Sequence, residues 1–466
     1  MKKIVVAAAA LLTTAAGAQA ADLRAKAPYL KAPVAQVYDW TGFYVGANAG
    51  FGFGRSATTV LSLAPANEQA RLGGLGALGG VQAGYNWQFG SLLGFNNVVL
   101  GVEADIQGAG FDDDRTCGLT TVGPNCTAYN QKIDWFGTVR GRVGLATGPV
   151  LSYFTGGFAY GNVKTTFNDV NAGVSETFSN TRTGWTLGSG VEAALGGNWT
   201  GKIEYLYLDL GTQSGVGVAH AFSSDVRAHT FRAGLNYRIG GSGLYAAAPV
   251  ANWAGFYGGL NAGGATALNR SSVAVVGAPT ESFNLSPDGY LGGGQIGYNL
   301  QAGALVYGLE ADIQGATLRD NKNCLLTCVP GTAANFDQKL QWFGTVRGRL
   351  GYSLGSTLFY ATGGLAYGNV KTRVQEAFLG GAIDATFSHT KAGYAVGGGI
   401  ESPFDFLGLF GPNWTSKTEY LYVDLGRTTD TYTVSGTTHV FSTRVEEHVF
   451  RTGLNYHFNT PVVAKY

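Results

Sequence analysis

The feature that most constrains the fold of this chain is an internal duplication. Its 466 residues contain long identical blocks that recur at a separation of a little over two hundred residues. The block Trp135–Arg142, with the sequence WFGTVRGR, returns unchanged at 342–349. Self-similarity at a fixed spacing indicates a repeated structural unit. We therefore expect two homologous units at 39–239 and 253–458, joined by a linker at 240–252.

Each unit has the pattern of a series of β-strands. Between 100 and 107 the even positions are apolar, whereas the odd positions carry Gly101, Glu103, Asp105 and Gln107. An alternation with period two predicts a strand with one apolar and one polar face. We expect eight strands in the first unit, near 40–54, 79–90, 96–110, 129–147, 149–166, 178–195, 198–211 and 226–239. In the second unit we expect them near 253–267, 289–302, 304–318, 335–354, 357–376, 384–402, 413–427 and 442–458.

The alternation fits a soluble sandwich as well as a membrane barrel, but composition and strand length favour the barrel. Charged residues make up only 13% of the chain, and aromatic residues such as Trp40, Trp87 and Tyr237 lie near strand ends. Most of the expected strands reach the roughly 9–11 residues that a tilted strand needs to cross a bilayer. The 73 glycines suit a tightly curved sheet. The formal net charge of +1 gives no reason to expect a nucleic-acid partner.

The N-terminus has the pattern of a secretory signal peptide. Lys2 and Lys3 precede a short apolar stretch, and Ala18–Ala20 is a cleavage motif of small residues. We expect residues 1–20 to be the signal peptide and 21–38 a leader. Export places the mature chain in an oxidising compartment.

The four cysteines form two local pairs in polar segments. Cys117 lies close to Cys126, and Cys324 lies close to Cys328. In an oxidising compartment we expect each pair to form a disulfide; free thiols and a metal site are the alternatives. The histidines do not stand at ligand spacing beside these cysteines, so we expect neither a metal nor another cofactor.

Several motifs carry a resemblance to a known family. They include WTGFYVG at Trp40–Gly46, KIEYLY at Lys202–Tyr207 and FRAGLNY at Phe231–Tyr237. With these motifs the chain resembles the outer-membrane β-barrel proteins of alphaproteobacteria, the outer-membrane immunogenic protein or porin family. The resemblance implies an eight-stranded antiparallel barrel in the outer membrane, surface loops and no catalytic residues. This chain departs from the family pattern by its duplication and by a C-terminal tail at 459–466.

The duplication allows two arrangements: two tandem eight-stranded antiparallel transmembrane β-barrels, or one sixteen-stranded barrel. Each unit retains a complete first and last strand, as expected if each closes on itself. The linker at 240–252 is long enough to join two barrels. A large pore usually also needs a long constricting loop, for which 54–78 and 268–288 are the longest candidates. We favour two barrels.

The charged faces of the strands are expected to point into the lumen. An eight-stranded barrel has room only for side chains, so buried charges need to pair there. We expect a salt-bridge network in each lumen, with an ion path as the alternative. In the first unit the network comprises Glu103, Asp105, Glu192 and Glu204 with Arg140, Arg142, Lys164, Lys202 and Arg232. In the second unit it comprises Glu310, Asp312, Glu401 and Glu419 with Arg347, Arg349, Lys371, Arg373, Lys417 and Arg451.

These features predict an outer-membrane protein with a structural or surface role. The alternative is a porin for small hydrophilic solutes. A lipid-modifying barrel enzyme is a third class, for which no catalytic constellation of residues is visible. We expect outer-membrane lipid, lipopolysaccharide and, during insertion, the barrel assembly machinery as partners. A second copy of the chain, in a homo-oligomer, is a further candidate partner.

Overall fold

The structure is a computed structural model that describes most of residues 38–458. The gaps in this description are residues 55, 63–67, 73, 93–94, 116–126, 170–172, 218–219, 241–249, 276–279, 324–332, 379–380 and 405–409. The expected signal peptide, nearly all of the leader, the four cysteines and the C-terminal tail lie outside the described residues. Among the described residues no helix is long and apolar enough to cross a membrane.

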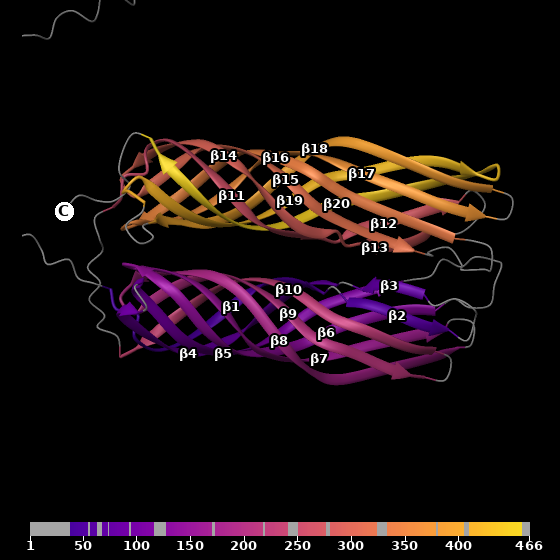
Figure 1. The fold of residues 1–466 in the computed structure, drawn as a ribbon, viewed down its shortest axis with the longest axis horizontal. Coiled ribbons are helices and arrows are strands. Elements are labelled where there is room, and N and C mark those ends of the chain that lie inside the picture. The colour runs from indigo at the N-terminus through magenta and orange to yellow at the C-terminus, as the bar shows by residue number, and fades with distance from the viewer. Residues whose placement is uncertain are drawn as a thin grey trace, which may run out of the picture. The chain divides into compact units, whose positions relative to one another are not determined.

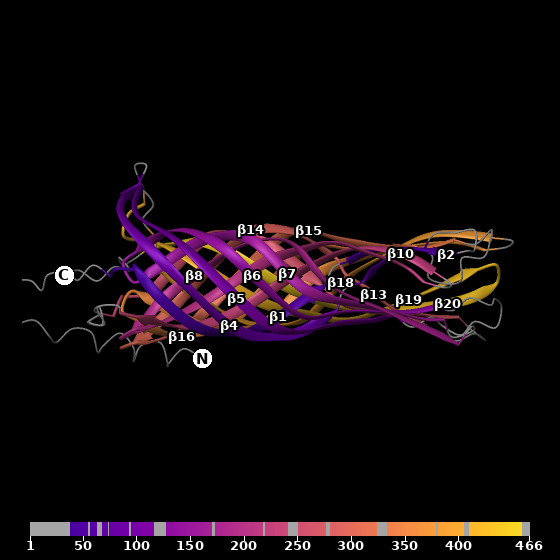
Figure 2. The same cartoon turned by 90° about the horizontal axis from the view of Figure 1, so that it is seen from below.

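The first unit is a closed antiparallel barrel of eight strands. Seven neighbouring pairs follow chain order, and β10 returns to β1 with a register that runs from Phe43↔Ile239 to Gly54↔Ala228. Figure 1 shows the strands wound obliquely around the barrel, and Figure 2 shows the same tilt after a 90° turn. The barrel strands are β1 (Gly42–Gly54), β4 (Leu75–Leu92), β5 (Phe95–Arg115), β6 (Thr127–Thr147), β7 (Val150–Asp169), β8 (Val174–Gly196), β9 (Trp199–Val216) and β10 (His220–Ile239).

The second unit repeats this barrel. Its first strand pairs with its last from Tyr257↔His457 to Ala267↔Glu447. Because each unit closes on itself, the alternative of one sixteen-stranded barrel is wrong. The strands are β11 (Gly255–Ala267), β14 (Asp288–Ala302), β15 (Leu305–Asn323), β16 (Ala333–Leu354), β17 (Thr357–Phe378), β18 (Gly381–Pro403), β19 (Trp414–Val434) and β20 (Thr437–His457).

The first hairpin of each unit adds two short strands to the loop end of the barrel wall. β2 (Ser56–Ser62) continues the line of β1 and pairs with β10, while β3 (Glu68–Leu72) pairs with β2. In the second unit β12 (Asn269–Val275) and β13 (Glu281–Leu285) occupy the same places beside β20. The segments 54–78 and 268–288, which were the longest candidate loops in the sequence analysis, therefore contain strands.

The two faces of each strand have different surroundings. Outward apolar side chains such as Val102, Ile106, Val139 and Phe154 are about half exposed or more. These side chains form the apolar outer band that a membrane barrel presents to lipid. Trp40, one of the aromatic residues near strand ends that favoured a membrane barrel, does not face lipid, because it is 1% exposed. Its indole Nε1 donates a hydrogen bond to the carbonyl oxygen of Gly148.

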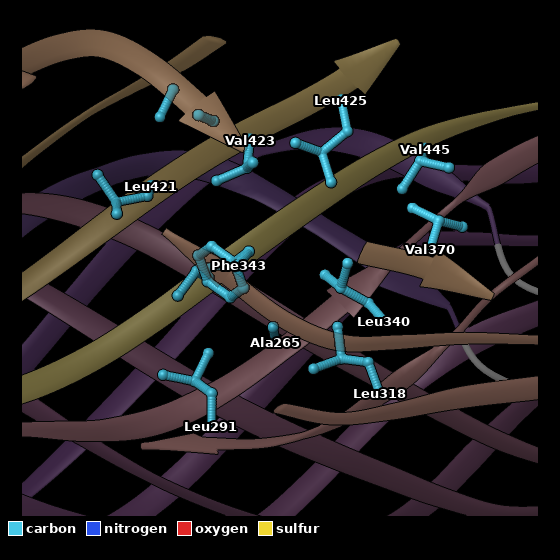
Figure 3. Packing of buried hydrophobic residues seen from close by; sticks show 13 residues of the cluster. Ala265, Leu291, Leu318, Leu340, Phe343, Val370, Leu421, Val423, Leu425 and Val445 are labelled. Carbon is cyan, nitrogen blue, oxygen red and sulfur yellow. The ribbon is translucent and has the colours of Figure 1, made fainter. Parts of the chain in front are cut away.

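The lumen is filled in layers. At the end with the short turns, Trp40 packs with Val99, Leu151 and other buried side chains. Charged side chains fill the next layer, and an apolar cluster around Phe111 and Phe136 fills the one after it. The second unit has the same apolar layer, where Phe343 lies among the side chains labelled in Figure 3. An even number of strands puts both ends of each barrel on the side of the short turns, which is periplasmic in outer-membrane barrels.

Candidate functional site: the charged layers of the two lumens

The charged layer of the first barrel centres on Arg140. Its Nη2 donates to Glu103 and, over 2.9 Å, to Asp105 Oδ2, while its Nη1 donates to Glu204 Oε1 over 3.1 Å. Arg232 joins the same acids, since it lies 2.8 Å from Asp105 and donates from Nε to Glu204 Oε2 over 2.7 Å. All of these charged side chains are fully buried. The two guanidinium groups therefore join three carboxylates in one connected cluster.

Two further cations complete the layer toward the periplasmic end. Lys202 Nζ donates to both carboxylate oxygens of Glu103 over 2.8 Å. Arg142 Nη2 donates to Glu192 Oε2 over 2.7 Å. Four acids therefore face four bases, which is the balance that buried charges need.

Two tyrosines bind the charged layer from the barrel wall. Tyr44 donates to Glu103 Oε2 over 2.8 Å, and Tyr153 donates to Glu204 Oε1 over 2.8 Å. Each ring lies across an inward-facing glycine: a Cβ on Gly84 would be 2.3 Å from the Tyr44 hydroxyl, and one on Gly190 would be 2.6 Å from the Tyr153 hydroxyl. The sequence reasoning missed this role. A signal for this role exists in the strand pairing, because each tyrosine stands opposite a glycine on the polar face.

An amide chain continues the polar layer around the wall. Asn48 donates to Gln82, Gln82 donates to Asn236 over 2.6 Å, and Asn236 donates to Glu192 Oε1 over 2.8 Å. Thr200 donates to the same oxygen of Glu192. The fourth acid of the layer is thus held by hydrogen bonds as well as by its arginine.

The second barrel builds the same layer from its own residues. Arg347 Nη2 lies 2.6 Å from Glu310 and 2.9 Å from Asp312, and its Nη1 lies 3.2 Å from Glu419. The remaining pairs join Lys417 to Glu310, Arg451 to Asp312 and Glu419, and Arg349 to Glu401. Tyr257 and Tyr360 take the places of the two tyrosines.

Three cations that were expected in the lumen lie elsewhere. Lys164, Lys371 and Arg373 are exposed on the outer face of β7 and β17, and Arg373 pairs there with Asp384 at 2.5 Å. In β7 the odd positions point inward, as buried Tyr153 shows, so the even position 164 points outward. The described part of the chain holds no cluster of three His, Cys, Asp or Glu that suits a metal ion.

Comparison with known proteins places the chain in a family. The family model described as "Outer membrane protein beta-barrel domain" matches residues 6–238 and again 239–458. The 31 kDa outer-membrane immunogenic protein of Brucella melitensis is 41% identical over 251 residues, which cover 51% of this chain and all of that protein. The 25 kDa outer-membrane immunogenic protein of the same species is 31% identical, over 51% of this chain and 99% of that protein.

A third relative comes from another genus. The 22 kDa outer membrane protein of Rhizobium leguminosarum is 35% identical over 179 residues, which cover 38% of this chain and 68% of that protein. All three names place the relatives in the outer membrane, and the closed barrels fit that location. The chain therefore belongs to the family of the outer membrane protein beta-barrel domain, carries that domain twice, and is an integral outer-membrane protein with a surface role.

Proposed function

We propose that both barrels are closed membrane anchors that support the envelope and present their loop ends at the cell surface, without a diffusion channel and without catalysis. The observation that carries this proposal is the charged layer. In each lumen four acids and four bases join across the barrel, and their side chains are at most 2% exposed. Such a layer leaves no continuous aqueous path.

The layers on either side of the charged layer also support a closed lumen. The periplasmic mouth of the first barrel is filled around Trp40, and that of the second around Trp253. On the other side of the charges, apolar side chains fill both lumens. An ion that entered would have to cross an apolar layer and then disrupt buried ion pairs, both of which cost several kcal/mol.

Conductance in planar bilayers tests the closed lumen. The full chain is inserted from detergent after a gel has shown the heat-dependent mobility shift of a folded barrel. A lack of conductance then cannot result from unfolded protein. We expect no steady single-channel steps. Steps on the nanosiemens scale would contradict the proposal and favour the porin alternative.

We further propose that outer-membrane lipid and lipopolysaccharide surround the barrels and that the barrel assembly machinery inserts them. The support is the outward face, where large apolar side chains such as Phe154 and Leu187 are more than half exposed. A face of this kind suits hydrocarbon rather than water. Insertion into vesicles with and without purified assembly machinery tests this point, and equal rates would count against it.

A further inference from the structure

The outward face of the second barrel carries a row of three arginines across three neighbouring strands. In the register of β19 and β20, Arg427 stands opposite Arg444. On the other side of β20, Ser271 stands opposite Thr443, which puts the preceding residue of β12, Arg270, beside Arg444. Directly opposed residues have Cβ atoms about 4.5–5.5 Å apart, and like charges at that distance repel.

Among the described residues, carboxylates neutralise only the middle arginine of this row. Arg444 lies 2.6 Å from Asp424 Oδ2 and 2.8 Å from Glu446 Oε1. Arg427 donates from Nη1 to the hydroxyl of Ser442 over 3.2 Å. Among the described residues no carboxylate lies within ion-pair distance of Arg427 or Arg270, and both side chains are exposed. Two positive charges at the ends of the row are therefore left without an anion.

The two uncompensated arginines share a pocket. Arg270 and Arg427 line a shallow hollow of about 270 Å³ together with Ser272, Ser282 and Asn284. Guanidinium forks and short polar side chains in one hollow are the donors that bind phosphate oxygens, and arginine binds them with two parallel hydrogen bonds. The hollow thus has the size and the chemistry for a phosphate group.

The first barrel lacks this row. Its hydrogen bond between Thr58 and Ser224 corresponds to the one between Ser271 and Thr443. At the three positions that correspond to the arginines, the first barrel has Ala57, Asp225 and Thr212; Arg71 stands one strand further, opposite Ala57. The row is therefore a property of the second unit rather than of the barrel framework.

The row stands at the level of a lipid headgroup. Tyr394, which is 47% exposed, stands opposite Asp424, the acid that binds Arg444. Exposed aromatic side chains mark the interface of a membrane barrel. Arg427 lies three residues beyond Asp424 toward the loops, and a strand tilted by roughly 40° rises about 2.5 Å per residue. The arginines thus stand about 7 Å beyond the level of Tyr394, where headgroups lie.

We propose that Arg270 and Arg427 bind a phosphate group on the headgroup of a glycolipid in the outer leaflet. The proposal rests on the membrane-embedded barrel described above and names one lipid contact of its surface. Outer-leaflet lipid is the occupant because Arg270 and Arg427 stand exposed on the outward face of the barrel, on the loop side of exposed Tyr394, and not in the lumen. Positive charge that meets a phosphorylated headgroup also removes the repulsion within the row.

The test is lipid binding by the full chain in neutral detergent, measured by native mass spectrometry. The probe is lipid A that carries its phosphates, titrated against the unmodified protein and against Arg270→Gln/Arg427→Gln. We expect the double variant to bind at least tenfold more weakly and each single variant at least threefold more weakly. The matched control is Arg227→Gln in the first barrel, whose arginine already pairs with Asp209 at 3.3 Å; we expect its affinity to stay within twofold. The heat-dependent gel shift verifies that each variant is folded.

Two further arms identify the source of the phosphate. Lipid A stripped of its phosphates should bind to the unmodified protein as weakly as the intact lipid binds to the double variant. Millimolar inorganic phosphate should not displace the intact lipid. Equal binding by the double variant, equal binding of the stripped lipid, or full displacement by inorganic phosphate would each overturn the proposal. Channel activity in bilayers would overturn the closed-anchor function and leave this lipid site standing.

Discussion

At the scale of single residues, Arg140 is the side chain on which most of the first charged layer depends. Its guanidinium contacts Glu103, Asp105 and Glu204, and it also donates to the hydroxyls of Thr138 and Thr155. A buried ion pair adds little net stability when it is complete, but the loss of one partner leaves buried charges without compensation.

We therefore expect Arg140→Ala to destabilise the first barrel by about 3–5 kcal/mol. The measurement is the temperature at which the folded form loses its heat-dependent gel mobility, and Arg347→Ala should lower it similarly through the second barrel. Lys164→Ala is the matched control, because this cation is exposed on the outer face and its removal should shift the midpoint little. An unchanged midpoint in Arg140→Ala would contradict a stabilising charged layer.

Glu447 differs from these acids because no cation of the described residues forms an ion pair with it. The side chain of Asn269 approaches its carboxylate, but neither carboxylate oxygen has a well-formed hydrogen bond among the described residues, and inward-facing Val423, Val445 and Val449 lie around it in the apolar layer. The register gives the first barrel Ala228 at the corresponding place. An unsatisfied buried polar group is costly.

We expect Glu447→Leu to stabilise the second barrel by about 1–3 kcal/mol, because it removes that cost and fills the same space with apolar atoms. Ala228→Glu is the reciprocal variant and should destabilise the first barrel. Urea midpoints of folded protein in micelles measure both changes. A loss of stability in Glu447→Leu would show that the carboxyl has a favourable partner.

The sequence predicted most of the charged layer because its strands alternate cleanly. In 100–107 every charged residue has the same parity, and all of them do point inward. In β7 the alternation is blurred, since large and aromatic residues occur at both parities there. The prediction that Lys164 points into the lumen was wrong for that reason. The role of Tyr44 and Tyr153 was missed because an aromatic residue in a membrane barrel is expected to face lipid. Only the pairing of each tyrosine with a glycine on the neighbouring strand shows that it faces the lumen.

At the scale of elements, the sixteen strands that close the two barrels were predicted in the right order, but many were predicted too short toward the loops. β10 begins at His220 and β8 at Val174, several residues before the expected 226 and 178. Beyond the membrane the outward face meets water, so the apolar alternation fades although the hydrogen-bonded ladder continues. The hairpin of β2 and β3 was missed for the same reason.

The loop end of the second barrel contains a buried acid whose environment depends on pH. The Glu376 carboxylate accepts a hydrogen bond from Tyr432 at 2.5 Å and lies 3.1 Å from His439 Nδ1. Burial raises the pKa of Glu376, although the hydrogen bond from Tyr432 and the charge of His439 act in the opposite direction. A raised pKa favours the folded state while the acid is protonated, and that stabilisation is lost as the pH rises through the raised pKa.

We therefore expect the loop end of β19 and β20 to open more readily at about pH 7 than at about pH 4, the ordinary range of a glutamate. Hydrogen exchange of the backbone amides of 430–441, corrected for the intrinsic effect of pH, measures this opening. In Glu376→Gln the side chain stays neutral, so the difference between the two pH values should shrink. Equal protection of the unmodified protein at both pH values would refute the expectation.

At the scale of the whole molecule, the decisive fact is that each copy satisfies its own hydrogen bonds. β1 pairs with β10 and β11 pairs with β20, so neither barrel borrows a strand from the other. Each copy also has its own charged layer and its own apolar layer. The alternation of apolar and polar residues could not show this closure, because one large barrel and two small barrels have the same alternation. The closure depends on which strands pair at the ends of each sheet.

We expect each copy to fold when it is produced alone. Residues 38–240 and residues 250–458, refolded separately into detergent micelles, should each give a heat-dependent gel shift and a β-sheet circular dichroism spectrum. A closed barrel has no unpaired edge, so each half should remain monomeric. If instead the halves fold only when mixed, the hydrogen bonds that close each barrel are not sufficient, and the duplication has produced one interdependent structure.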